Sequence, residues 1–229
     1  MRLGGQVVDR LTAAKAVLAD FLDRRVGDRV GLLLFGQRAY AVTPLTLDRN
    51  SVRDQLLDSV VGLAGQETAI GDAIALAVKR LGERDEASAE EGERVVILLT
   101  DGVNTAGAIT PDRALALAQA AAIRVHTIGF GGLGGSVILG MQVPGGTQID
   151  EATLRRVADG TGGRYFRARD TAELAGIYAE LDRIEPTAEP GEVLQPRIER
   201  YAVPLAGALL LGLLAALVRM LGGGRRAWA

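Results

Sequence analysis

The strongest constraint on the fold is a strand-length run, Arg94–Thr100 (RVVILLT), that is apolar at nearly every position. A strand that faces solvent on one side alternates apolar and polar residues, but the interior of this run has no polar face. Strands of this kind are typical of parallel sheets that carry helices on both faces. The run therefore predicts a buried strand, apolar on both faces, in a layered α/β domain.

Helix-like and strand-like patterns alternate on both sides of this run. The periodicity predicts helices over Asp9–Arg25, Ser51–Val61, Ala69–Leu81, Pro111–Ala122, Glu151–Asp159 and Thr171–Ile184. It predicts further strands over Arg29–Phe35, Ala39–Thr43, Ile123–Gly129 and Arg164–Ala168. The short gap between the first two of these predicts a hairpin, hence one antiparallel edge strand. The whole pattern predicts a doubly wound, mostly parallel sheet with helices on both faces.

Side-chain chemistry at the helix starts supports these boundaries. Ser, Thr and Asp accept hydrogen bonds from the free N–H groups of a first helical turn. The predicted N-caps are Ser51, Thr110 (followed by Pro111), Asp150 and Thr171.

Composition removes several classes of chemistry. The 229 residues include no cysteine, which excludes disulfides, thiolate metal sites and cysteine nucleophiles within them. The one histidine, His126, lies in a predicted strand between apolar neighbours, which favours a core residue over a metal ligand. A net charge of −2 provides no basic field for nucleic acid.

A second apolar run, near the C-terminus, predicts a membrane helix. Ala202–Val218 contains no charged or strongly polar residue and as a helix would span about 25 Å. A buried core helix is the alternative, but such a helix rarely lacks polar residues on every face. Pro and Gly residues ahead of the run are typical of a linker. We therefore predict a soluble domain over 1–185, a linker over 186–200, a single transmembrane helix over 201–221 and a basic tail over 222–229.

A glycine pattern, Gly129-x-Gly131-x-x-Gly134, formally matches the dinucleotide-binding fingerprint. That fingerprint needs a helix to begin within it, because the helix N-terminus holds the pyrophosphate. The residues up to Ile149 are rich in glycine and include Pro144, so they predict a surface loop instead. A nucleotide-binding α/β enzyme stays the alternative from another functional class.

Two oxygen-bearing residues are placed to bind a hard cation. Asp101, followed by Gly102, ends the RVVILLT strand, and the carboxyl ends of parallel strands face the crevice where ligands bind. Thr68 precedes a predicted helix and offers a hydroxyl. Each has a local alternative, since Asp101 could only cap its own turn and Thr68 could only cap the helix.

Together these blocks resemble a von Willebrand factor A (VWA) domain. More narrowly, the chain is similar to the BatA-type bacterial aerotolerance family of membrane-anchored VWA proteins. The residues that carry the resemblance are Asp28–Tyr40 (DRVGLLLFGQRAY), Pro44–Arg49 (PLTLDR), Thr68–Leu81 (TAIGDAIALAVKRL), Val95–Gly107 (VVILLTDGVNTAG), Asp150–Ala168 (DEATLRRVADGTGGRYFRA) and the terminal apolar run.

The resemblance implies a metal-ion-dependent adhesion site that normally holds Mg²⁺. Thr68 would be its threonine ligand, and Asp101 the aspartate that reaches the ion, usually through water. Neutral hydroxyl ligands leave the ion under-neutralised, so an acidic residue of a partner protein can complete its shell. The implied activity is binding rather than catalysis.

The resemblance also implies partners and a location. The partners would be related VWA membrane proteins and a MoxR-type AAA+ ATPase, in envelope or stress-tolerance assembly. Arg219, Arg225 and Arg226 follow the apolar run, so the positive-inside rule puts the tail in the cytoplasm. We expect a bacterial inner-membrane protein whose VWA domain is periplasmic or otherwise extracytoplasmic.

The chain departs from the family at its start. The site's Asp-x-Ser-x-Ser element, at the end of the first central strand, is absent, and Met1–Val8 is too short for that strand and its loop. We therefore expect a sheet that lacks its first central strand, with unpaired groups costing about 1–3 kcal/mol each on the neighbouring strands. The expectation is that Met1 is an internal methionine of a longer protein. The alternative is a truncated, metal-free VWA scaffold.

Overall fold

The computed structural model describes residues 2–3, 6–7, 10–60, 65, 67–83, 93–131, 135–138, 141–144, 149–187, 210–214 and 217. The chain divides into two compact units, Met1–Pro190 and Gly191–Ala229. The helices of the first unit are α1 (Arg10–Arg24), α2 (Arg49–Asp58), α3 (Ile70–Gly82), α4 (Pro111–Ala120), α5 (Glu151–Gly160) and α6 (Thr171–Ile184). Its strands are β1 (Arg2–Leu3), β2 (Gln6–Val7), β3 (Val30–Phe35), β4 (Ala39–Thr46), β5 (Val95–Thr100), β6 (Arg124–Phe130), β7 (Gly135–Ile138), β8 (Met141–Pro144) and β9 (Tyr165–Ala168).

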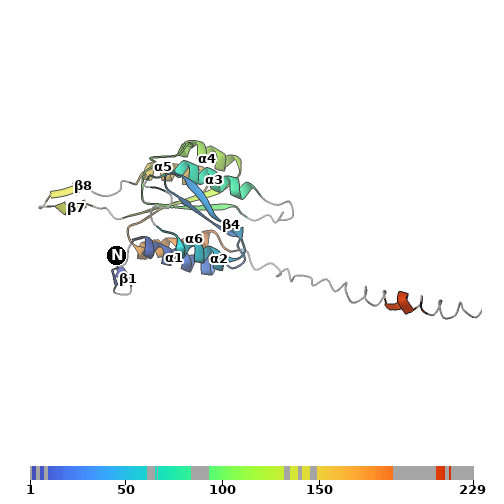
Figure 1. Ribbon diagram of the computed structural model, residues 1–229. Helices are drawn as coiled ribbons and strands as arrows, with labels where there is room; N and C mark the ends of the chain where they lie inside the picture. Colours follow the sequence, from blue (N-terminus) through green and yellow to red (C-terminus); the bar gives the residue numbers. More distant parts are fainter. Residues whose placement is uncertain are drawn as a thin grey trace, which may run out of the picture. The chain divides into compact units, whose positions relative to one another are not determined.

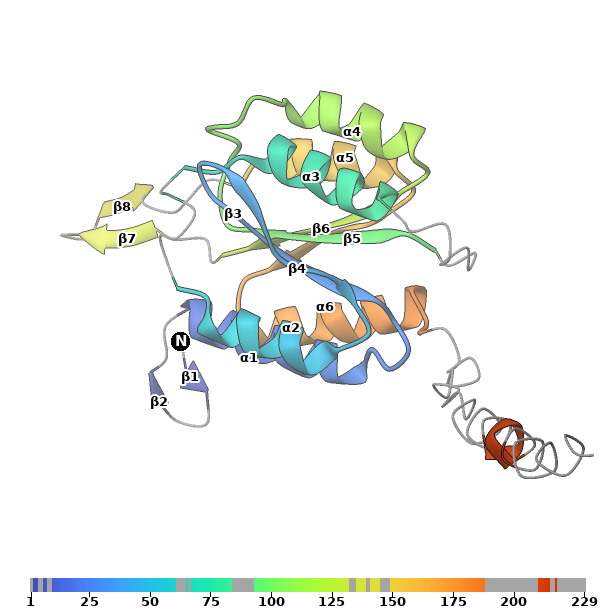
Figure 2. The same ribbon diagram turned by 45° about the vertical axis from the view of Figure 1, so that its right-hand side comes forward.

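The first unit is a three-layer α/β arrangement. Helices α3, α4 and α5 lie on one face of the strands, and α1, α2 and α6 lie on the other (Figures 1 and 2). Each helical layer packs an apolar cluster against the strands. One cluster includes Ile70, Ile74, Leu98, Ile123, Val125 and Leu154, and the other includes Phe21, Ile128, Leu174, Tyr178 and Leu181. The predicted α/β class is confirmed.

A parallel sheet with the strand order β5-β6-β9 forms the middle layer of this core. The central strand β6 is buried over nearly all its length, because helices cover both its faces. Its register pairs Thr100 with Gly129 and Phe130 with Ala168, so the carboxyl ends of all three strands meet at one edge. We call this edge the carboxyl edge.

The strands β3 and β4 form a separate antiparallel pair, as their hairpin spacing predicts. Within the described residues, β3 pairs only with β4 and β5 only with β6. The prediction that the RVVILLT run is fully buried was wrong. In β5, only Leu98 and Thr100 are buried and the other residues are half-buried, because β5 is an outer strand of its three-stranded sheet.

The predicted helix caps are half right. Thr110 and Asp150 cap α4 and α5, accepting hydrogen bonds from the N–H groups three residues later. The N-cap of α2, in contrast, is Asp48 and not Ser51. The N-cap of α6 is Asp170 and not Thr171. A carboxylate accepts hydrogen bonds from the free N–H groups as a hydroxyl does, and its negative charge is also stabilised by the positive end of the helix dipole.

The glycine-rich stretch after β6 is not a plain loop. Its described residues form an antiparallel hairpin, β7 with β8, that projects from the layered body in Figures 1 and 2. Gly135 begins a strand rather than a helix. The residues 132–134 lie outside the described part of the chain.

The second unit is described only at residues 210–214 and 217, which are helical. Its leucines 210, 211, 213, 214 and 217 are between 59% and 71% exposed. In the described stretches of the chain, no helix is both long and apolar enough to cross a membrane. The predicted span, 201–221, falls mostly outside those stretches, as do the predicted tail and most of the linker.

Candidate functional site

Thr68 and the turn that begins with Asp101 lie close together at the carboxyl edge although they come from different segments. Asp101 directly follows β5 and is exposed, and Thr68 lies two residues ahead of α3. A Cβ atom placed on Gly102 would lie 3.0 Å from the Thr68 hydroxyl oxygen. The glycine therefore lets the turn after β5 come into contact with the Thr68 side chain, one residue after Asp101.

The local roles that would occupy these two side chains are taken by other residues. The turn after β5 is closed by the Gly102 N–H, which donates to Thr100 Oγ1 at 3.3 Å, not by Asp101. The residue at the N-cap of α3 is Ala69, not Thr68, and it makes no side-chain cap. Within the described part of the chain, neither the Thr68 hydroxyl nor the Asp101 carboxylate makes a hydrogen bond. Both oxygens are therefore available to a ligand.

The backbone of Thr68 is fixed on both sides by the segment that follows Asp101. The Thr68 N–H donates to Thr105 Oγ1 at 2.9 Å. The Thr68 carbonyl accepts from the N–H groups of Thr105 and Ala106, at 2.9 and 3.2 Å. Three hydrogen bonds thus connect the two segments within a few residues of the candidate ligands.

Two more side chains extend this connection along α3. Asn104 Oδ1 accepts from the N–H groups of Ile70 and Gly71, at 2.8 and 3.3 Å, and so caps the helix from another segment. The Asp72 carboxylate accepts from the N–H groups of Ala108 and Ile109, at 3.1 and 2.7 Å. The first turn of α3 and the segment 101–109 are therefore held together.

Sequence reasoning did not assign roles to Asn104, Thr105 or Asp72. Their signal is present in retrospect, because Asn and Thr commonly bond to backbone groups and an acidic residue in a first helical turn often binds N–H groups. What the sequence could not show is that their partners lie more than 30 positions away.

Gly71 lets these two segments come close. A Cβ atom at this position would lie 1.9 Å from the carbonyl oxygen of Ile109, well inside contact distance. No larger residue fits here without moving the backbone of one segment.

The donor set at the carboxyl edge suits a hard cation. A hydroxyl and a carboxylate are oxygen ligands of the kind that Mg²⁺ prefers, and Mg²⁺ usually keeps several waters. Within the described residues, no three His, Cys, Asp or Glu side chains cluster in a way that could hold a metal ion. A metal site here would therefore use the Thr68 hydroxyl and the Asp101 carboxylate, and its remaining ligands would come from water or from other groups.

His126 is a satisfied core residue, as its surroundings in the sequence predict. It is 1% exposed, its Nε2 lies 2.8 Å from Glu185 Oε1, and its Nδ1 accepts from the Arg164 N–H at 3.0 Å. Burial alone would raise the pKa of Glu185, but hydrogen bonds from Arg124 and His126 outweigh burial and hold that pKa below its ordinary value. Both ring nitrogens of the histidine are engaged, so it offers no ligand position.

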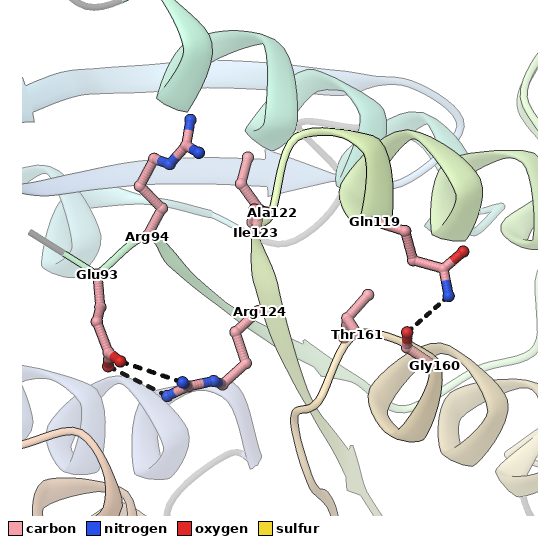
Figure 3. Close-up of a pocket in the computed structure, with 8 residues that line it drawn as sticks. All are labelled: Glu93, Arg94, Gln119, Ala122, Ile123, Arg124, Gly160 and Thr161. Atoms are coloured by element: carbon pink, nitrogen blue, oxygen red, sulfur yellow. Dashed lines mark hydrogen bonds and ion pairs between the residues drawn. The ribbon is translucent and has the colours of Figure 1, made fainter.

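A hollow of about 360 Å³ lies at the other end of the sheet, where β5 and β6 begin (Figure 3). Its charged groups are already paired. Arg124 binds Glu93 at 3.2 Å, Arg94 donates to the carbonyl of Ala121 at 2.5 Å, and Gln119 donates to that of Gly160 at 2.6 Å. Since these groups have partners within the protein, this hollow is a weaker candidate than the carboxyl edge.

Comparison with known proteins identifies the family to which this architecture belongs. Residues 4–180 match the von Willebrand factor type A domain family. An aerotolerance-related membrane protein from Bacteroides fragilis is 26% identical, with a TM-score of 0.58 over 75% of this chain and 87% of that one. The conserved hypothetical protein BatB from Bacteroides thetaiotaomicron is 29% identical, with a TM-score of 0.57 over 76% of this chain and 88% of that one.

Curated relatives are longer than this chain. A UPF0353 protein from Mycolicibacterium paratuberculosis is 30% identical over 220 residues, which cover 90% of this chain and 63% of the relative. The chain thus spans less than two thirds of the length of this relative. From the family match and the shared architecture, the chain belongs to the von Willebrand factor type A domain family and is related to the aerotolerance membrane proteins.

Proposed function

We propose that this chain is the interaction module of a membrane-anchored VWA protein and binds a protein partner through Mg²⁺ held at Thr68 and Asp101. The observation that carries the proposal is the contact of Thr68 with Gly102, directly after Asp101, where neither the Thr68 hydroxyl nor the Asp101 carboxylate has a partner among the residues that the structure describes. The roles that would otherwise engage both side chains belong to Asn104 and Thr100.

The charge at this edge favours binding over catalysis. One carboxylate leaves Mg²⁺ with a net positive charge, which an acidic side chain of a partner neutralises when it enters the coordination shell. The resemblance assigns further ligands to an Asp-x-Ser-x-Ser element that the 229 residues do not contain. We therefore place full Mg²⁺ affinity in a form of the protein that carries that element. A metal-free VWA scaffold is the alternative, and it predicts no metal dependence in any form.

The second unit supports a membrane anchor. Its described leucines are exposed although they belong to an apolar run, and lipid is the environment in which such side chains are covered. A similar protein is described as a membrane protein.

We propose a bacterial inner-membrane location with the VWA domain outside the cytoplasm, where related VWA proteins are its neighbours and a MoxR-type ATPase is an assembly partner. Protease added to intact spheroplasts should digest the domain, and full protection would contradict this sidedness.

Thermal unfolding with and without Mg²⁺ tests the metal part of the proposal. With a dissociation constant of about 1 mM, Mg²⁺ at ten times that concentration stabilises the folded protein by about 1.4 kcal/mol. The unfolding midpoint of the protein extracted from its membrane should therefore rise by about 3–5 °C.

Matched variants assign that effect to the site. Asp101→Ala and Thr68→Val should abolish the Mg²⁺-dependent rise, whereas Asp54→Ala, which removes an exposed carboxylate on α2, should leave it unchanged. An equal rise in all four proteins would refute the assignment of these ligands.

A further inference from the structure

A groove of about 460 Å³ adjoins the carboxyl edge, between the start of β4, the outer side of α3 and the segment that follows Asp101. Its apolar lining consists of Ala39, Ala75, Leu76, Ala108 and Ile109. Its charged lining consists of Arg38, Asp72 and Lys79.

The charge that the groove offers to a ligand is positive. The Asp72 carboxylate is engaged by two backbone N–H groups of the groove wall. Within the described residues, the Arg38 guanidinium makes no ion pair or hydrogen bond, and the ammonium of Lys79, whose side chain is 67% exposed, has only a 3.7 Å contact with Glu83. Exposed pairs of that kind contribute little. An apolar floor beneath two available cations is complementary to a segment that carries apolar and acidic side chains together.

The groove and the candidate metal site are built from the same two chain segments. The segments 68–72 and 101–109 carry the candidate ligands and also supply Asp72, Ala108 and Ile109 to the lining of the groove, and Asn104 and Asp72 hold the two segments together. Thr68 and Asp72 are four residues apart in the chain, which separates them by at most about 14 Å. An extended peptide advances about 3.3 Å per residue, so a few residues suffice to reach from one to the other.

We propose that this groove docks the residues beside the partner's metal-binding acid, with an apolar side chain on the floor and a second acidic side chain between Arg38 and Lys79. The placement of both features on one partner rests on the proposed function. The preference of the groove for an apolar, acidic segment does not depend on metal.

The groove is tested first without metal. The full 229-residue chain, in detergent micelles with EDTA, is titrated with N-acetyl-Leu-Asp-Glu-amide and with N-acetyl-Leu-Lys-Lys-amide while backbone amide resonances are followed by NMR. The acidic peptide should shift the amides of Ala39, Ala75, Leu76 and Ala108, with a dissociation constant of about 1 mM. No shift at these amides, or an equal response to the lysine peptide, overturns the proposal whatever the protein does with Mg²⁺.

A variant pair locates the charge that the groove uses. Arg38→Ala should weaken binding of the acidic peptide about threefold, as expected for loss of one exposed charge contact. Arg80→Ala is the control, because Arg80 lies on α3 next to Lys79 but does not line the groove and pairs with Glu83 at 2.7 Å. An equal effect of the two variants contradicts a specific role for Arg38.

A longer peptide, with one more Asp placed three residues ahead of the Leu, separates this proposal from the proposed function. In the protein extracted from its membrane, Mg²⁺ should tighten the binding of this longer peptide to the wild type but not to Asp101→Ala. Groove shifts without any Mg²⁺ effect support the groove and refute the metal-bridged partner. A Mg²⁺ effect without groove shifts supports the metal site and overturns the groove.

Discussion

Replacement of Asn104 tests whether the cap that this side chain provides holds the candidate site together. Asn104→Ala removes the oxygen that accepts from the N–H groups of Ile70 and Gly71, at 2.8 and 3.3 Å. Both N–H groups are partly buried, and one lost hydrogen bond of this kind costs about 1 kcal/mol. We expect a loss of about 2 kcal/mol, which is the upper part of the range for lost helix caps.

The loss can be measured by thermal unfolding of the full chain in detergent micelles, followed by far-ultraviolet circular dichroism. For a domain of this size, 2 kcal/mol corresponds to a fall of about 4–8 °C in the unfolding midpoint. Asn104→Asp is the control, since it keeps an acceptor oxygen and adds a negative charge at the helix N-terminus. Its midpoint should stay within about 2 °C of the wild type. A loss below about 0.5 kcal/mol for Asn104→Ala would refute the role of this side chain as the cap.

Three further substitutions test the packing of the domain and the pH dependence of its stability. Gly71→Ala should destabilise it by more than about 2 kcal/mol in the same assay, because the added Cβ would lie 1.9 Å from the Ile109 carbonyl oxygen, and a neutral effect would contradict that close approach. Tyr178→Phe should be neutral or stabilising by about 1 kcal/mol, because the buried Tyr178 hydroxyl has no hydrogen-bond partner among the described residues, and a clear loss would reveal one. The pKa of Glu185 is lowered in the folded protein, so its contribution to stability is present above its unfolded pKa of about 4.3 and is lost as the pH falls through the lower folded value. Glu185→Gln should flatten the acid side of the stability profile, whereas an unchanged acid side would show that other groups determine it.

The sequence predicts most of the elements because their signals are local. Thr110 with Pro111, and Asp150, start α4 and α5 where the pattern puts them, since a cap depends only on the next three residues. The parallel pairing of β5 with β6 follows from two apolar runs joined by one helix. Burial of β5 is different, because it depends on whether a strand lies beside it, and an apolar run does not specify its neighbour.

In the candidate site, too, the sequence predicts the local features but not the contacts between distant segments. Thr68 and Asp101 are positioned by local signals, namely a helix start and a strand end, together with the resemblance that gives them roles. The contacts that hold their segments together are made by Asn104 and Asp72, whose partners are more than 30 positions away in the chain. Such contacts follow from the packing of α3 against the segment after β5, which periodicity and spacing do not reveal.

The most direct test of the central proposal is paramagnetic broadening of backbone amide resonances by Mn²⁺, which substitutes for Mg²⁺ at oxygen sites and detects weak binding. In the full chain, substoichiometric Mn²⁺ should broaden the amides of Thr68, Asp101 and Gly102 before all others. Excess Mg²⁺ should reverse the effect, and Asp101→Ala should abolish it. Broadening that is spread over the exposed carboxylates, or that persists unchanged in Asp101→Ala, would contradict a metal site at the carboxyl edge.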